Sequence, residues 1–158
     1  MSFGITLDAS DLDDARLKLR RWFDFEPSEL MTAIAGMGES QTRRRIAEEK
    51  TAPDGTPWKP NSQDTSILMQ TGQHLLASVA SFASASEAQW GAAWEWAHVH
   101  QEGMTIVPKS AEALVFQLGG KTIRAKKVDI PARPFVGISD ENAREIVDAV
   151  TDFFGVLP

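Results

Sequence analysis

The sequence contains no cysteine and no tyrosine, and its hydrophobic residues form no long uninterrupted run. The absence of cysteine excludes disulfides, thiolate zinc sites, iron–sulfur clusters and cysteine nucleophiles. No apolar stretch approaches the roughly 20 residues that a membrane-spanning helix requires, and the first residues lack the basic and then apolar pattern of a secretory signal. We therefore expect a protein without membrane contact, made in the cytoplasm, that leaves it only as part of a larger assembly.

The length and the net charge indicate the number of domains and argue against one kind of binding partner. A chain of 158 residues fits one domain, over residues 1–158, with enough buried surface for a single core. Lysine and arginine number 16 against 22 aspartate and glutamate, which gives a net charge of −6. This balance argues against a general nucleic-acid binder that is held by phosphate neutralisation.

The charges are unevenly distributed near the C-terminus. Residues 121–133 carry five basic residues and one acidic residue, and residues 139–154 carry five acidic residues and one basic residue. Adjacent segments of opposite charge suit self-association through complementary patches, or they are simply two solvated faces. Our hypothesis is that basic residues of one copy contact acidic residues of a neighbour. The basic residues are Arg124, Lys126, Lys127 and Arg133, and the acidic ones are Asp140, Glu141 and Asp148.

Hydrophobic periodicity predicts an α+β fold, with a mixed or mostly antiparallel sheet packed against a long helix and a C-terminal amphipathic helix. Glycine and proline clusters leave residues 51–70 as a loop, flexible or functional, and Trp58 is expected to pin it to the body. Helices are expected over 11–22, 28–49, 71–78, 94–102 and 140–155, and strands over 3–7, 79–86, 87–92, 104–107, 113–118 and 121–128.

Two helices carry specific expectations. Gly36 and Gly38 lie inside the long helix, where glycine is unfavourable, so they indicate a close backbone approach or a kink. Ser139 is expected to cap the last helix, whose acidic first turn suits the helix dipole. The last helix also has one apolar face, made of Ala143, Ile146, Val147, Val150, Phe153 and Phe154.

Candidate catalytic groups are few. On a strand, His98, His100 and Glu102 would share one face and could ligate zinc or iron, but a helix over this segment turns His100 away from the other two. No serine lies in a Gly-x-Ser-x-Gly context, and no glycine-rich phosphate loop follows a strand. We therefore expect no enzyme, no cofactor and no metal site, and we keep a metal enzyme centred on these three residues as an alternative.

Three consecutive arginines, Arg43, Arg44 and Arg45, end the long helix. Together they span most of its circumference. They form ion pairs with nearby glutamates (Glu39, Glu48 and Glu49), contact another subunit, or bind DNA. The last alternative makes the protein a DNA-binding accessory factor that uses these arginines and the basic segment 121–133.

Four segments occur in a characteristic order. They are residues 54–60 around Trp58, residues 71–78 beginning with Thr71-Gly72, residues 96–103 containing His100-Gln101, and residues 130–139 with the run Pro131-Ala132-Arg133-Pro134-Phe135. Their order and spacing resemble the phage virion morphogenesis (tail completion) family of tailed bacteriophages and prophages. The resemblance spans residues 3–154.

The resemblance implies a structural protein of the virion that acts at the head–tail junction or the upper end of the tail. It implies a homo-oligomeric ring, contacts with the tail tube and the head–tail connector, and a channel in which DNA passes. Assembly would take place in the cytoplasm of the bacterial host. The residues that we expect at interfaces are Arg43, Arg44, Arg45, Trp58, His100, Gln101, Arg124, Lys126, Lys127, Arg133 and Phe135.

The residues themselves suggest how the last segment behaves. Pro131 and Pro134 fix the backbone and remove two donors, so residues 131–134 are expected to form a stiff extended connection between the sheet and the last helix. His100 and Gln101, at the end of a helix, offer polar groups to bind the loop or this connection. Val107, Val115, Phe116 and Ile123 supply strand residues whose free edges neighbours could pair with.

Overall fold

The computed structural model describes residues 25–61, 65–69 and 73–155, together with Arg16, Leu19 and Arg20. The strand expected over 3–7 lies outside the described residues. Of the helix expected over 11–22, only the three isolated residues are described, and all three are helical. None of the described helices is both long and apolar enough to cross a membrane.

The longest element is helix α2 (Pro27–Arg44), which continues into the π-helical turn η1 (Arg45–Glu49). Proline suits the first helical position, and an acidic first turn with basic residues in the last turn suits the helix dipole. The turn ends at Lys50, whose φ of 57° is left-handed. The helix expected over 28–49 is thereby confirmed, with its last turn wound more loosely.

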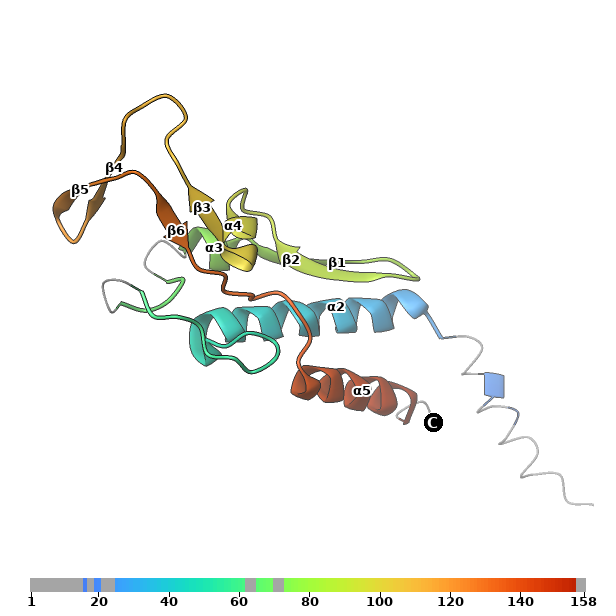
Figure 1. Cartoon of the computed structure of the whole chain (residues 1–158). Helices are drawn as coiled ribbons and strands as arrows, with labels where there is room; N and C mark the ends of the chain where they lie inside the picture. Colours follow the sequence, from blue (N-terminus) through green and yellow to red (C-terminus); the bar gives the residue numbers. More distant parts are fainter. Residues whose placement is uncertain (1–15, 17–18, 21–24, 62–64, 70–72, 156–158) are drawn as a thin grey trace, which may run out of the picture.

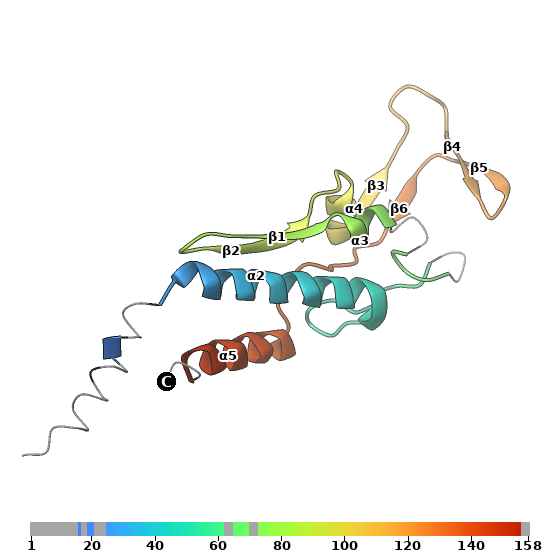
Figure 2. The same ribbon diagram turned by 180° about the vertical axis from the view of Figure 1, so that it is seen from behind.

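Helix α2 lies between two other elements. Strands β1 (Val79–Ala83) and β2 (Ala88–Ala92) form an antiparallel hairpin on one side of it, and α5 (Asp140–Gly155) lies along the other side (Figure 1, Figure 2). The hairpin approaches so closely that a Cβ on Gly38 would lie 2.2 Å from Cδ2 of Trp90. The close approach expected at Gly38 is thus confirmed, whereas a Cβ on Gly36 would meet nothing within 4 Å.

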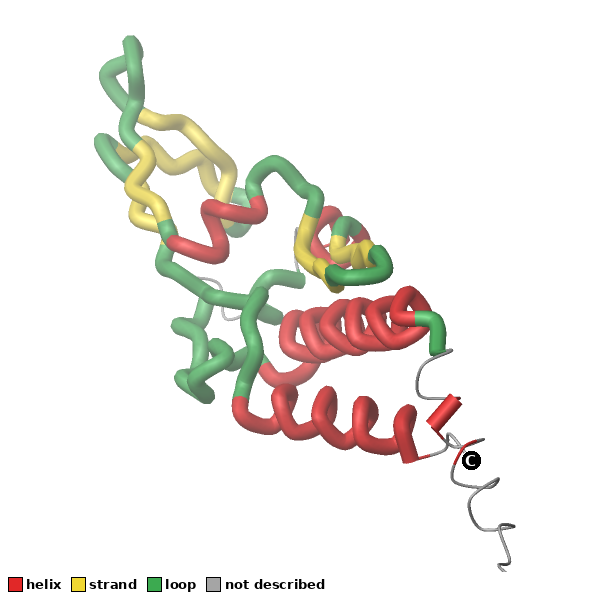
Figure 3. Tube along the Cα trace, turned by 90° about the vertical axis from the view of Figure 1, so that its right-hand side faces the viewer, coloured by secondary structure: helices red, strands yellow, loops and turns green. Residues whose placement is uncertain are grey.

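The core lies at the C-terminal end of α2. The short helices α3 (Gln73–Ala77) and α4 (Ala97–Glu102) gather there with η1, as the tube view also shows (Figure 3). Both helices were expected; Thr71, the proposed cap of the first, lies outside the described residues. The buried cluster consists of Ile46, Trp58, Leu68, Leu75, Val79, Ala97 and Phe135.

The remaining strands form two further antiparallel ladders. Strand β3 (Met104–Ile106) pairs with β6 (Val128–Ile130), and β4 (Leu114–Leu118) pairs with β5 (Lys121–Ala125). The α+β class and the antiparallel pairing are confirmed, but the described strands form three two-stranded ladders and not one continuous sheet. The turn at Gly119-Gly120, with positive φ at both residues, joins β4 to β5.

The strand expected over 121–128 is wrong in its extent. Strand β5 ends at Ala125, and Lys126 and Lys127 belong to neither ladder before β6 starts at Val128. The break arises because the chain leaves β4 at this point to pair with β3, a partner that lies elsewhere in space. Local alternation of side chains cannot reveal such a change of partner.

Helix α5 begins as expected, because the Ser139 hydroxyl accepts a hydrogen bond from the Asn142 backbone N–H at 3.1 Å. Its apolar face is only partly covered. Phe153 and Phe154 pack edge-on against Phe25. In contrast, Val147 is 60% exposed. The apolar face of α5 therefore divides into a part against the body and a part open to solvent.

Candidate functional site

Residues 131–139, which we call the arm, run from β6 across α2 to the start of α5 (Figure 1). The arm has no regular secondary structure, so its backbone groups need partners from elsewhere. Phe135 at its centre is 1% exposed and belongs to the core. The centre of the arm is therefore buried, and its backbone groups must be held by side chains.

Gln101, in the last turn of α4, supplies the first set of partners. Its side-chain oxygen accepts hydrogen bonds from the backbone N–H of Phe135 at 3.0 Å and of Val136 at 3.1 Å, and its amide donates to the Val136 carbonyl at 3.0 Å. The backbone N–H of Arg133 donates to the carbonyl of His100 at 2.7 Å. The expectation that the end of this helix binds the arm is confirmed.

The loop that follows η1 supplies the second set. The indole of Trp58 donates to the carbonyl of Pro134 at 3.1 Å, and the ring is 5% exposed. In return, the guanidinium of Arg133 donates to the carbonyl of Lys59 at 3.0 and 3.1 Å and to that of Pro60 at 3.3 Å. Trp58 thus pins the loop, as expected, and the surface it is pinned to is the arm.

Arg45 supplies the third set. Its side chain is 1% exposed and donates to the carbonyls of Phe135 at 3.2 Å and Gly137 at 2.9 Å, and to the side-chain oxygen of Asn142. Burial lowers the pKa of Arg45, and Glu49, whose carboxylate lies 3.7 Å from Nε, partly opposes that shift. Arg45 therefore fixes the end of the arm and the first turn of α5 to η1.

The other two arginines of the triplet are also engaged inside the chain. Arg43 pairs with Glu39 and donates to the carbonyls of Leu76 and Val79, and Arg44 pairs with Glu49 at 2.8 Å. Arg44 also binds Glu145, whose pKa is lowered by a hydrogen bond from Gln41 and by Arg44. The ion-pair interpretation is confirmed for Glu39 and Glu49, and it leaves these arginines poorly placed to bind phosphates.

The histidines lie on a helix, not on a strand. His98 is exposed, and His100 stacks on Trp94 with ring centroids 5.7 Å apart. The pKa of His100 is lowered because burial disfavours the charged ring and because Arg133 is nearby. In the described part of the chain, no three His, Cys, Asp or Glu residues are placed to hold a metal ion.

Apart from Arg43 and Arg44, which are paired with glutamates as described above, the predicted interface residues divide into two groups. Arg45, Trp58, Gln101, Arg133 and Phe135 converge on the arm, together with His100, whose ring is partly buried. Arg124, Lys126 and Lys127 lie exposed on β5 and just after it, and Lys127 pairs with Asp129 at 2.9 Å. An interface role for either group stays a prediction.

Asn142 is the residue of this site that sequence reasoning missed. Its side-chain oxygen binds Arg45, and it also accepts from the Ser139 backbone N–H at 3.4 Å, which completes a reciprocal cap. The sequence did contain a signal for this role. Asn142 lies three residues after the capping Ser139, and the side chain at that position pairs with the capping residue in a capping box.

Comparison with known proteins gives a consistent result. Residues 7–154 match the model of the phage virion morphogenesis family. Mu-like prophage FluMu G protein 2 of Haemophilus influenzae is 28% identical over 128 residues, which cover 81% of this chain and 78% of that protein. Tail completion protein S of Escherichia phage P2 is 32% identical over 113 residues, covering 71% and 73%. No solved structure matches the chain significantly.

Proposed function

The chain belongs to the phage virion morphogenesis family, and we propose that it completes the tail as a homo-oligomeric ring at the tail terminus or neck. There it would join the tail tube to the head–tail connector. The family membership and the relative named as a tail completion protein support the role in tail completion. The ring and the joining of head and tail are the steps that we add.

The observation that carries the ring is the β4–β5 hairpin. It stands away from the rest of the molecule (Figure 1, Figure 2), and neither of its faces has a fully buried residue. An isolated two-stranded hairpin is at best marginally stable in water. The β4–β5 hairpin would be more stable if another subunit covered it. Its presence therefore favours a contact between subunits at this place.

A structural role also agrees with how the polar side chains are used. Arg45, Trp58, Gln101 and Arg133 donate to backbone carbonyls of the arm or of the loop beside it, which fixes the relative position of η1, α4 and α5. Groups that are occupied by backbone hydrogen bonds hold a shape and are not available to transform a substrate. We therefore propose a non-enzymatic component of the virion.

The proposed location follows from the role. The subunits would be made in the cytoplasm of the bacterial host and would remain in the finished particle. DNA would pass through the ring during packaging or ejection. A net charge of −6 suits that passage, because a strongly phosphate-binding wall would retain the DNA.

The test is a deletion in the phage or prophage that encodes this chain. We expect filled heads and separate tails in electron micrographs, with joined particles restored by the wild-type chain in trans. Averaged images of the restored junction should show a closed ring that contains this chain. Joined, infectious particles without the chain would overturn the proposal, and so would a single copy at the junction.

A further inference from the structure

One face of the β4–β5 hairpin lines an open hollow. Its apolar lining includes Ala111, Ala113 and Val115, and Val115 is 58% exposed. Arg124 and Lys126 line the same hollow, with Glu112 as its acidic member. The register places Arg124 directly opposite Val115, so the charged and the apolar side chains share this face.

The basic residues of this hollow, Arg124 and Lys126, are exposed to solvent. Within the described part of the molecule, neither Arg124 nor Lys126 forms an ion pair, whereas Lys127 is paired with Asp129. A hollow lined by both apolar and basic side chains fits an apolar surface that carries carboxylates. The apolar side chains in its lining distinguish this hollow from a surface for nucleic acid, which relies mainly on phosphate contacts.

The outer side of α5 offers the matching chemistry. Ala143 and Val147, one helical turn apart, are exposed, and Asp148 and Asp152, also one turn apart, are exposed beside them. Asp140 and Glu141 add two exposed carboxylates. Arg144 is the basic residue on this side and donates to the Asp140 carbonyl of its own helix.

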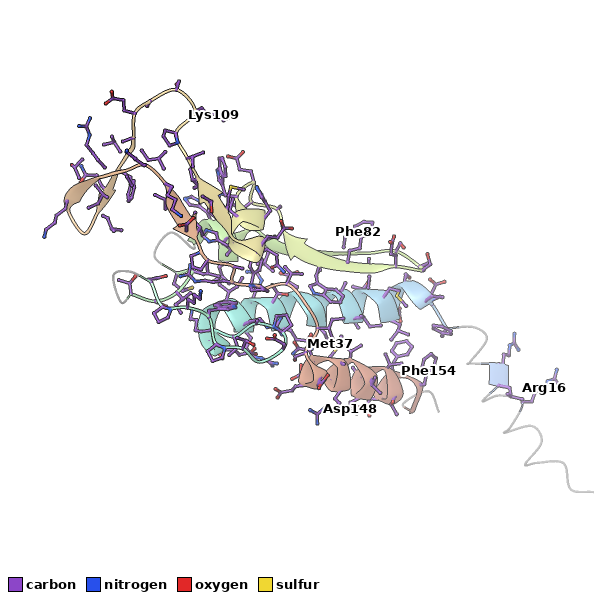
Figure 4. All side chains as sticks on the ribbon, in the orientation of Figure 1. Arg16, Met37, Phe82, Lys109, Asp148 and Phe154 are labelled. Atoms are coloured by element: carbon purple, nitrogen blue, oxygen red, sulfur yellow. The ribbon has the colours of Figure 1, made fainter. Side chains whose placement is uncertain are left out.

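The two surfaces lie at opposite ends of the molecule. In both ribbon views the hairpin projects beyond one end, while α5 runs toward the other (Figure 1, Figure 2). Figure 4 places Lys109, which precedes β4, far from Asp148 on α5. The hollow and the helix therefore cannot meet within one copy. A contact between copies through two different surfaces is head-to-tail, the kind that closes into a ring when the rotation permits.

We infer that the hairpin hollow of one copy receives the outer side of α5 of the next copy. Val147 and Ala143 pack on Val115 and the two alanines, and Arg124 and Lys126 face Asp148 and Asp152. This inference rests on the proposed homo-oligomer and names its contact. It also removes Arg133 from the basic partners that the sequence suggested, because Arg133 is 7% exposed and binds Lys59 and Pro60.

The proposed contact is tested by reversing the charges on each surface separately and then on both surfaces together. Arg124→Glu with Lys126→Glu, or Asp148→Lys with Asp152→Lys, should each weaken self-association by about tenfold or more in Kd, because like charges then face each other. The chain with all four substitutions should regain association, since the pairs are restored with opposite sign. Sedimentation velocity or native mass spectrometry gives the readout. Glu87→Lys with Glu95→Lys, two exposed acids away from α5, is the matched control and should leave association unchanged.

The absence of natural cysteine permits a second test. A chain with Lys126→Cys, mixed with a chain with Asp148→Cys, should form a cross-linked dimer with a short bismaleimide. Neither chain alone should do so through this contact. If the wild-type chain is monomeric in solution, the same cross-link is carried out on assembled particles.

The outcomes separate this inference from the proposed function. Association that survives both reversals, or particles in which the mixed cysteine chains do not cross-link, would overturn the contact. The role in head–tail joining would stand, because the deletion phenotype decides it. If the hairpin reversal abolished DNA retention and left self-association intact, the hollow would be a nucleic-acid surface and the inference would fail.

Discussion

Gln101 and Phe135 are joined by a hydrogen bond of 3.0 Å in which the side-chain oxygen of the first accepts the backbone N–H of the second. The carbonyl of Phe135 accepts from Arg45 on the opposite side. A buried backbone unit is thus satisfied by two side chains from different elements, as buried polar groups require. The arm owes its position to such contacts, and the predictions below test them.

Gln101→Ala removes three hydrogen bonds to the arm at once. The two backbone N–H groups and one carbonyl that remain are partly buried, so we expect a loss of about 1–3 kcal/mol in the free energy of unfolding. Urea unfolding followed by tryptophan fluorescence measures it. Gln117→Ala, which removes an exposed hydrogen bond to Thr122, is the control and should change stability by less than about 0.5 kcal/mol. Equal effects of the two substitutions would contradict the role of Gln101.

The adjacent residues Arg44 and Arg45 should differ sharply in how much each contributes to the free energy of unfolding. Arg45→Ala leaves two arm carbonyls and Asn142 without their partner in the interior, and should cost about 3 kcal/mol or more. Arg44→Ala removes partly exposed ion pairs to Glu49 and Glu145 and should cost at most about 1 kcal/mol. Thermal unfolding of both variants under one buffer condition compares them. A cost for Arg44 as large as that for Arg45 would refute the assigned positions.

Substitution of two glycines of α2 by alanine should change the stability of the protein in opposite directions. Gly36→Ala adds a methyl group into open space and should stabilise the protein by up to about 1 kcal/mol through helix propensity. Gly38→Ala places its Cβ against the Trp90 ring and should destabilise by about 1–3 kcal/mol, because the hairpin must move away from the helix. Only Gly38→Ala should also change the tryptophan fluorescence, because only this substitution disturbs the Trp90 ring. Stabilisation by both would show that the hairpin does not pack at this distance.

Acid should weaken the fold through His100. Its pKa is lowered in the folded chain from the ordinary value of 6.5, first by burial and then by the charge of Arg133. The unfolded chain therefore takes up the proton first, so stability is highest above about pH 6.5. It falls as the pH drops below that value and levels off below the folded pKa.

The measurement is the free energy of unfolding at pH 7.5 and at pH 5.0. His100→Gln should reduce the loss between the two conditions, whereas His98→Gln, an exposed residue of the same helix, should keep it. An undiminished acid loss in His100→Gln would assign the effect to other groups.

Several features of the site were predictable because they depend on local chemistry. Pro131 and Pro134 predict an extended arm, Ser139 predicts the start of α5, and Trp58 among turn residues predicts a loop held to the body. Gln101 was predicted to bind the arm from its place at a helix end. Each of these follows from residues a few positions apart.

Other features were not predictable from local chemistry. The sequence pattern could not show that Arg45 reaches the arm 90 residues away and is buried while its neighbour Arg44 stays partly exposed. It could not show that the strand expected over 121–128 divides after Ala125 to pair with two different partners. The apolar pattern of α5 did not reveal that Val147 faces solvent, because a pattern records which residues are apolar and not what lies against them.

The amino-acid sequence alone indicated the helices and strands of the described residues, an α+β class with mixed or mostly antiparallel pairing, the family and the separation of basic and acidic segments. These properties depend on backbone preferences, on side-chain periodicity and on motifs in chain order. Only the tertiary structure decided which arginines form hydrogen bonds and ion pairs inside the chain. It also decided which basic residues remain exposed on the β4–β5 hairpin, at the end opposite α5. That division depends on contacts between residues far apart in sequence, whose geometry exists only once the chain has folded.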